Sequence, residues 1–411
     1  MKNSLLLVLF LVTASCWGQD SYTLPLAKAN TTLSLPAMTA GSGVLYEAHR
    51  SFDLLRFSNQ LQVSAYDLAT HKELRHTVMS VPRVHGARAA EGLFLSPDGA
   101  TLVYAEIYEP MLLIVLSAKD LSEVRRTNDL LFTKADSHCL FAGFDGSGLL
   151  SFASIRGPNL RFIRMDVSNL KITSDVAGPK PHYYNEPIVW SPKRRIVWME
   201  SASEEWEEYT EEGHSTGEKL TTEWRRGTSW GAVIFGESNL LAFYGNFSDS
   251  GNIVSYKNHR SSEKELTCVP RPYSSGDVAE YAGAICTTSP DREPENGGNK
   301  ILSSEFLLLK ADGPTIAWRH PMDLLSVADS NDTDTGRQRG NPLLYRAGSK
   351  LLIVAPSKSP DLTVYEVPLP NDSSVGGWRT FPRGTGVNPC TIETRGGAES
   401  FLRFMQKRFG F

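Results

Sequence analysis

Four polar residues stand at one position of a repeating sequence pattern, just before a short apolar segment: Glu91, His138, Glu186 and Glu280. If these apolar segments are strands that share one axis, their leading side chains meet at the mouth of a channel. An imidazole and three carboxylates could hold a divalent metal there. They could also act as an acid–base pair, because neighbouring carboxylates move one another's pKa apart. The simpler hypothesis, which we favour, is that they are solvated polar residues.

Two further histidines, His85 and His182, fall in the connections that lead to the same positions. Arg83 and Arg88 stand near the first, and aromatic residues and an asparagine follow the second. Loops on a rigid scaffold often carry binding residues, and this set would suit a sugar or a peptide. Ordinary loop packing is the alternative.

The elements that would position these residues are strands joined by short polar turns. Seven apolar pairs each open the second strand of such a hairpin: Val44-Leu45, Leu102-Val103, Leu149-Leu150, Ile196-Val197, Leu240-Leu241, Ile301-Leu302 and Leu351-Leu352. Their spacing of about 40–60 residues is typical of β-propeller blades, which bury their faces by stacking. We therefore expect an all-β protein, a seven-bladed propeller of four-stranded antiparallel blades.

The expected domain organisation is one propeller over 19–383, preceded by a signal peptide over 1–18 and followed by a tail over 384–411. The predicted blades are 43–83 with an innermost strand near 30–39, then 84–134, 135–180, 181–226, 227–272, 273–335 and 336–383. The segment from Tyr22 to Leu26 could add a strand to the last blade and close the ring. The tail is expected to contain a short helix that packs on the propeller, with Phe401, Leu402, Met405 and Phe409 on one side.

The second blade carries the most specific motif. Ser96-Pro97-Asp98-Gly99 is followed by an apolar strand at Thr101 to Ala105, and Asp-Gly suits a tight hairpin turn. This motif resembles the blades of the TolB-like (WD40-like) propellers of the bacterial periplasm. The resemblance implies a propeller that binds proteins or small molecules, and it implies no catalytic residues.

The N-terminus predicts export. Lys2 precedes an unbroken apolar run from Leu5 to Val12, and small residues up to Gly18 follow it. The run is too short to span a bilayer, and no later segment is long and apolar enough, so no transmembrane segment is expected. We expect a secreted or periplasmic protein. The alternative is a lipoprotein anchored at Cys16.

Composition excludes some partners. A formal charge of −4 over 411 residues argues against nucleic acid, which requires clustered cations. Cys139, Cys268, Cys286 and Cys390 could oxidise after export, in any of three pairings. A Cys268–Cys286 bond would join the end of one blade to the first strand of the next. The acidic run from Glu200 to Glu212 predicts a charged outer edge on blade four.

No sequence motif for a serine hydrolase elbow, a zinc protease or a P-loop occurs. We therefore favour an exported, non-catalytic, monomeric module that binds a protein, a small molecule or a carbohydrate. No cofactor is expected beyond a possible divalent metal at the channel mouth. The alternative is a propeller enzyme with its site at that mouth, such as a metal-dependent hydrolase, lactonase or lyase.

Overall fold

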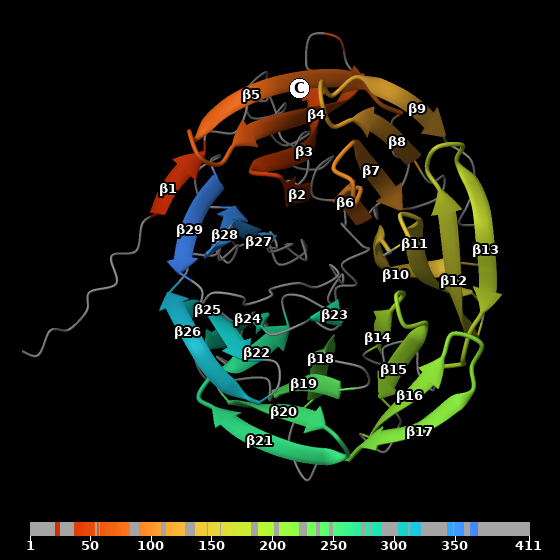
Figure 1. The fold of residues 1–411 in the computed structure, drawn as a ribbon, viewed down its shortest axis with the longest axis vertical. Helices are drawn as coiled ribbons and strands as arrows, with labels where there is room; N and C mark the ends of the chain where they lie inside the picture. Colours follow the sequence, from red (N-terminus) through yellow and green to blue (C-terminus); the bar gives the residue numbers. More distant parts are fainter. Residues whose placement is uncertain are drawn as a thin grey trace, which may run out of the picture.

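The chain forms a ring of seven antiparallel sheets in a computed structural model (Figure 1). The structure describes residues 21–24, 37–82, 90–127, 136–181, 188–221, 228–288, 303–321 and 343–368, with short gaps at loops inside these ranges. The predicted signal peptide and the predicted C-terminal helical tail lie outside the described residues. The predicted seven-bladed architecture is confirmed.

Each blade contributes four consecutive positions of the ring, from the channel outward. Blades one to three are β2 (Ala37–Gly41), β3 (Val44–Asp53), β4 (Ser58–Asp67) and β5 (Lys72–Ser80); β6 (Ala90–Leu95), β7 (Thr101–Ile107), β8 (Leu112–Ser117) and β9 (Glu123–Thr127); and β10 (Asp136–Phe144), β11 (Leu150–Arg156), β12 (Asn159–Asp166) and β13 (Lys171–Ala177). Blades four and five are β14 (Ile188–Ser191), β15 (Ile196–Glu200), β16 (Trp206–Thr210) and β17 (Ser215–Leu220); and β18 (Thr228–Phe235), β19 (Asn239–Gly245), β20 (Gly251–Lys257) and β21 (Arg260–Leu266). Blade six is β22 (Val269–Pro272), β24 (Tyr281–Thr288), β25 (Ser303–Lys310) and β26 (Thr315–Pro321), and blade seven is β27 (Leu343–Ala347), β28 (Lys350–Pro356), β29 (Leu362–Pro368) and β1 (Ser21–Leu24).

The N-terminal strand closes the ring, as the sequence predicted. β1 pairs antiparallel with β29, with Tyr22 opposite Val364, and becomes the outermost strand of blade seven. Leu24 is fully buried against blade one, and the Tyr22 ring stacks on His71 at a centroid distance of 3.5 Å. The last blade is therefore assembled from both ends of the described chain.

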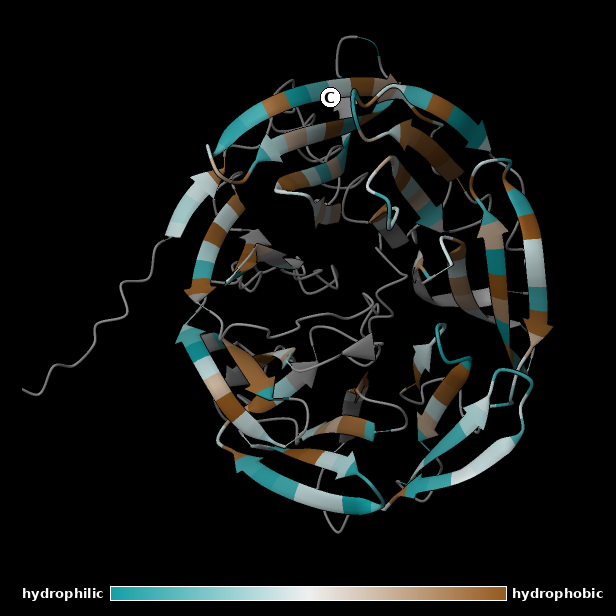
Figure 2. Ribbon diagram, in the orientation of Figure 1, coloured by the Kyte–Doolittle hydropathy of each residue, from teal (hydrophilic) through white to brown (hydrophobic). Residues whose placement is uncertain are grey.

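The core is divided among the seams between neighbouring blades. Side chains alternate along each strand, so one strand contributes to two seams. Leu102 packs toward blade one while the adjacent Val103 packs toward blade three, and both are fully buried. Figure 2 shows the corresponding alternation of hydropathy along the outermost strands β5 and β13. Middle strands are apolar on both faces because they have a blade on either side.

The turn of blade two has the geometry that its sequence predicts. Gly99 has a φ of 71°, which a residue with a side chain rarely adopts. The Asp98 carboxylate accepts hydrogen bonds from the Ser96 hydroxyl and the Ala100 amide, and these bonds lower the pKa of Asp98. This hairpin positions β6 and β7, which carry part of the candidate site.

Blade six differs from the prediction by one strand. Its innermost strand is β22, which the sequence pattern assigned to the end of blade five, and β24 is its second strand. The hairpin of blade six therefore does not open at Ile301-Leu302, because β25 is the third strand. The repeat was misread because β22 has only four residues, two of them proline, so it lacks the pattern of an apolar strand.

A short segment after β22 also joins the neighbouring blade. β23 (Asp277–Val278) pairs in parallel with β18, the innermost strand of blade five, and makes that sheet five-stranded. Figure 1 shows β23 on the channel side of β18. The channel is therefore narrowed beside blade five.

Candidate functional site

Only two of the six predicted site residues lie on described strands. Glu91 is the second residue of β6, and His138 is the third residue of β10. Both therefore lie within innermost strands, slightly further along than predicted. His85, His182, Glu186 and Glu280 lie outside the described residues. Glu280 immediately precedes β24, the second strand of its blade, so it does not hold the position that groups the other three. Whether these residues converge stays a prediction.

The register of blade two places a second acidic residue beside Glu91. Glu91 on β6 lies directly opposite Glu106 on β7. Opposed positions on neighbouring strands share a face of the sheet, with Cβ atoms about 5 Å apart. Glu106 is buried, with 3% of its surface exposed. The described part of the channel mouth therefore has an acidic pair in register, and the sequence analysis had found only one member.

Arg50 connects this acidic pair to blade one. Its Nη2 atom donates to Glu106 Oε2, and its Nη1 atom donates to the Pro82 carbonyl oxygen at 3.1 Å. Pro82 begins the connection to β6 in which the predicted residue His85 falls. Arg50 is itself buried. One guanidinium therefore joins the seam between blades one and two to the start of a predicted binding loop.

The Glu106 carboxylate is only half satisfied. Among the described residues, no donor reaches its Oε1 atom. Burial raises the pKa of Glu106, and the charge and hydrogen bond of Arg50 oppose this effect. An incompletely paired buried carboxylate is costly unless a further donor or cation meets it. This atom is the strongest indication of a ligand position that the described residues provide.

A second polar pair lies on the opposite face of β3. Glu47 and His49 alternate with Ala48 and Arg50, so they face blade seven instead of blade two. The Glu47 carboxylate contacts His49 Nδ1, and both side chains are buried. Burial raises the pKa of Glu47, and the hydrogen bond from His49 opposes the rise. This pair lies in the seam where the ring closes.

Ser64, His76 and Glu73 have the residue types of a catalytic triad but not its arrangement. The Ser64 hydroxyl lies 3.2 Å from His76 Nδ1, and Glu73 Oε1 lies 4.0 Å from the same nitrogen. A triad needs the nucleophile and the carboxylate on different ring nitrogens. Ser64 is also fully buried. We assign this group to packing on blade one.

The acidic run of blade four is structural, and the predicted acidic outer edge is wrong. β16 is the third strand, and β17 covers it. Glu211 is fully buried and accepts hydrogen bonds from Arg164 at 2.6 and 3.0 Å, from Trp190 Nε1 at 2.9 Å and from Arg195 Nε at 3.1 Å. Glu208 is buried as well and accepts from the Thr216 hydroxyl at 2.9 Å. Part of the run turns inward because blade three supplies a cation to meet it.

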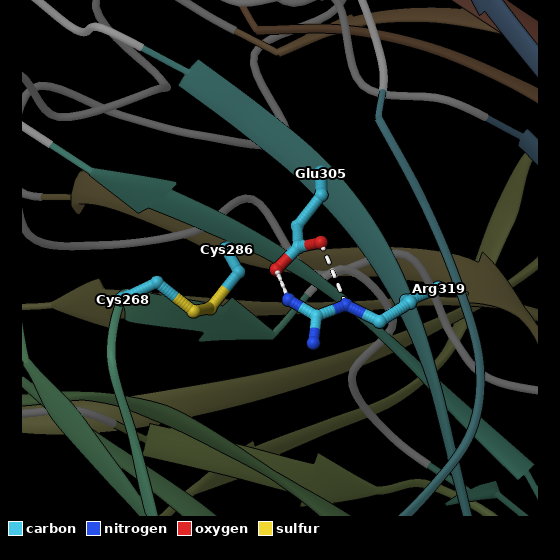
Figure 3. The surroundings of a disulfide bond; sticks show 4 residues. All are labelled: Cys268, Cys286, Glu305 and Arg319. Carbon is cyan, nitrogen blue, oxygen red and sulfur yellow. Dashed lines mark hydrogen bonds and ion pairs between the residues drawn. A yellow bond between two sulfur atoms is a disulfide. The ribbon is translucent and has the colours of Figure 1, made fainter.

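Cys268 and Cys286 form a disulfide, with Cα atoms 5.5 Å apart (Figure 3). Cys268 immediately precedes β22 and Cys286 lies on β24, so the bond joins the first two strands of blade six. The expected link between two blades is therefore wrong, for the same reason that β22 was misassigned. Cys139 lies on β10, and Cys390 lies outside the described residues.

Glu305 lies close to both sulfur atoms, within 4.8 Å. Such a group resembles a metal site by residue type, but disulfide sulfurs are not the thiolates that bind metals. The Glu305 carboxylate is instead paired with Arg319, whose Nε atom donates to it at 2.9 Å (Figure 3). This cluster is a covalent link and a surface ion pair.

Sequence reasoning missed Glu47, His49, Arg50 and Glu106. A signal was present, because β3 is a middle strand and should be apolar on both faces. The run from Glu47 to Ser51 breaks that rule at four of its five positions. Polar residues in a strand that has neighbours on both sides mark buried contacts across the seams.

Comparisons with known proteins find a likeness of fold. No protein-family model matches the sequence, and a search of curated proteins finds no match. Solved structures with a similar architecture include the β-propeller domain of the Trilobed protease from Pyrococcus furiosus, at 9% identity and a TM-score of 0.45, covering 84% of this chain and 97% of that one. The Cps50 (Swd1) β-propeller domain of Myceliophteria thermophila is 10% identical with a TM-score of 0.45, covering 85% and 99% of the two chains. The dihydro-heme d1 dehydrogenase NirN is 15% identical with a TM-score of 0.42, covering 87% and 68%. Because these likenesses are distant, they carry no conclusion about function.

Proposed function

We propose that this protein is an exported binding module whose ligand is held at the channel mouth, beside the seam between blades one and two. The observation that carries the proposal is the Glu106 carboxylate, buried, opposed to Glu91 and without a donor on Oε1 among the described residues. Binding by polar groups gathered at a concave part of a rigid scaffold is the common arrangement of small-ligand sites. The seam supplies the rigidity.

The ligand that fits this position is a cation or carries one. Arg50 neutralises one negative charge, and Glu106 and Glu91 supply two when both are ionised. A positive ligand would offset the remaining charge and satisfy the Oε1 atom. Carboxylate oxygens favour Ca²⁺ or Mn²⁺ over softer metals, and an ammonium group would meet the same oxygens. His138 and Glu186 are the further residues we propose for the site.

Export fits the buried disulfide of blade six. Disulfides persist in oxidising compartments and are rare in the cytosol. The part of the chain that the structure describes has no helix capable of crossing a bilayer. Intact-mass analysis of the native protein should find a mature chain that begins after Gly18. A diacylglycerol on Cys16 would support the lipoprotein alternative, and a retained leader would contradict export.

The binding proposal is tested by thermal shift with Ca²⁺, Mn²⁺ and Zn²⁺ as probes. We expect Ca²⁺ or Mn²⁺ to raise the melting temperature of the wild type by mass action, and to raise that of Glu91→Gln much less. Glu212→Gln removes a carboxylate with 46% of its side chain exposed and serves as the matched control. Equal shifts in wild type and Glu91→Gln, or none in wild type, would remove the site.

A second variant tests how far the site extends around the mouth. The double substitution His138→Ala, Glu186→Gln should also reduce the shift if the predicted residues share one ligand. The reduction should be greatest at a pH at which His138 is neutral in the wild type, because only a neutral imidazole binds a metal. A full shift in this variant would confine the site to blades one and two.

A further inference from the structure

The outer hairpin of blade five, far along the chain from the proposed mouth site, carries a polar hollow. Its volume is about 450 Å³, and its lining is formed by Ser255, Lys257, Asn258, Arg260, Ser261 and Ser262. These residues come from β20, β21 and the turn between them. The lining therefore combines two cationic side chains with hydroxyl and amide groups and has no carboxylate.

Strand register explains how cations gather on one face of this hairpin. Lys257 lies opposite Arg260, Ser255 lies opposite Ser262, and Ile253 lies opposite Lys264. Opposed residues share a face, so three cations and two serines lie on the same side of the sheet. The acidic residues Glu263 and Glu265 occupy the alternate positions of β21 and belong to the other face. The sheet separates the two charges.

The acids near this hairpin are already engaged. Glu218 accepts from the Tyr256 hydroxyl at 2.8 Å and pairs with His259 at 3.1 Å. Glu263 accepts from Asn252 Nδ2 at 3.0 Å. Among the residues that the structure describes, neither Arg260 nor Lys264 forms an ion pair. The cationic face is therefore not neutralised from within the described chain.

The turn holds the two cations of the hollow in place. Asn258 and His259 have φ angles of 52° and 62°, which is typical of a tight hairpin turn with the twist of the strands. The Asn258 amide also donates to Asn239 Oδ1 at 3.1 Å and so fixes the turn to β19. Lys257 and Arg260 are thereby held at opposed positions before any ligand arrives.

We propose that this hollow binds a tetrahedral oxyanion, a phosphate or a sulfate group carried by a ligand. A guanidinium presents a planar fork that matches two oxyanion oxygens, and hydroxyl and amide groups supply further donors. Charges on an outermost strand also prevent pairing between sheet edges. That role does not account for the separation of cations to one face, or for the hollow they line.

The test is calorimetric titration of the full mature chain with inorganic phosphate, sulfate and acetate at constant ionic strength. We expect saturable binding of phosphate or sulfate that is stronger than that of acetate. The double variant Lys257→Gln, Arg260→Gln should weaken it at least about tenfold, the loss expected when charge-assisted hydrogen bonds are removed. The preferred anion of the two identifies the ester.

The matched control is Lys72→Gln, Arg125→Gln, which removes the same charge from exposed positions of β5 and β9. It should bind phosphate as the wild type does, and so should Glu91→Gln. Equal binding by both double variants would show an effect of net charge alone and overturn the proposal. The absence of saturable binding in the wild type would overturn it as well.

Discussion

Two buried glutamates in this ring, Glu211 and Glu106, show how differently a propeller can use the same residue. Glu211 lies where blades three and four meet and accepts four hydrogen bonds, two of them from Arg164. Glu106 lies where blades one and two meet and is held by Arg50 alone, through one oxygen. Both are almost inaccessible to solvent. Burial therefore does not separate a structural carboxylate from an available one, whereas the number of donors does.

The positions of the two glutamates in their blades fit this difference. Glu211 follows the third strand of its blade, β16, and the hairpin to β17 begins there. Glu106 lies on the second strand, opposite the innermost strand that lines the channel. A carboxylate next to the channel has space for a ligand on one side. We therefore regard the blade three–four contact as a fastening and the blade one–two contact as part of a site.

The largest effect is expected from an unpaired charge in a seam that has no polar partner. Leu102→Asp and Leu241→Asp each place a carboxylate where the side chain is now fully buried among apolar groups. Each should cost more than about 4 kcal/mol and abolish soluble expression. Leu74→Asp, at a position that is 46% exposed, is the control. A soluble Leu102→Asp protein with an unchanged melting curve would show that the seam tolerates charge generally.

Removing the saturated carboxylate should be the next most damaging change. Glu211→Gln leaves the Arg164 guanidinium buried with a diminished acceptor, since Asp145 lies 3.5 Å from its Nε atom and remains. We expect a loss of about 3–5 kcal/mol in the free energy of unfolding, measured by urea denaturation. Glu212→Gln should change it by less than about 1 kcal/mol. Similar losses in the two variants would remove the distinction between a fastening and a surface ion pair.

The half-satisfied carboxylate should respond to double substitution. Glu106→Leu alone leaves Arg50 buried without its carboxylate and should cost about 3 kcal/mol or more. Arg50→Met with Glu106→Leu removes both charges and should recover much of that loss, because a buried ion pair is often replaceable by apolar residues. A double variant no more stable than Glu106→Leu would mean that the pair is a fastening after all.

The smallest predicted effect concerns the seam that closes the ring. Burial, with a contribution from Glu366, raises the pKa of Tyr22 to about 12. The folded state therefore favours the neutral phenol, and this contribution to stability is complete below pH 10 and is lost as the pH rises toward 12. Ultraviolet titration of phenolate should lose one late-titrating tyrosine in Tyr22→Phe, with Tyr256 as the other. An unchanged titration curve would place Tyr22 outside the closing seam.

The sequence predicted the architecture well because turns and strands are local features. Asp98 and Gly99 identify a hairpin without any knowledge of distant contacts, and the alternation near Tyr22 indicated a closing strand. The prediction failed at β22, where two prolines hide a short strand and moved the blade boundary and the disulfide. A repeat that is read from apolar spacing cannot register a blade whose innermost strand is barely apolar.

The candidate site was less predictable because it depends on contacts across seams. Glu91 was identified from its place in the repeat, but Glu106 and Arg50 come from different blades and meet only in the closed ring. The same limit applies to the acidic run of blade four, whose inward turn depends on Arg164 in blade three. Position along a strand can be inferred from one chain, whereas the partner across a seam cannot.

The most direct test of the contrast is a crystal structure of the mature protein grown with Mn²⁺, in which anomalous scattering locates the metal. The account predicts a manganese peak within coordination distance of Glu106 Oε1, with Glu91 as a second ligand, and no peak beside Glu211. A donor side chain or backbone amide occupying the Glu106 Oε1 position in place of a metal would contradict it. In that case Glu106 would be as fully satisfied as Glu211, and both seams would be structural.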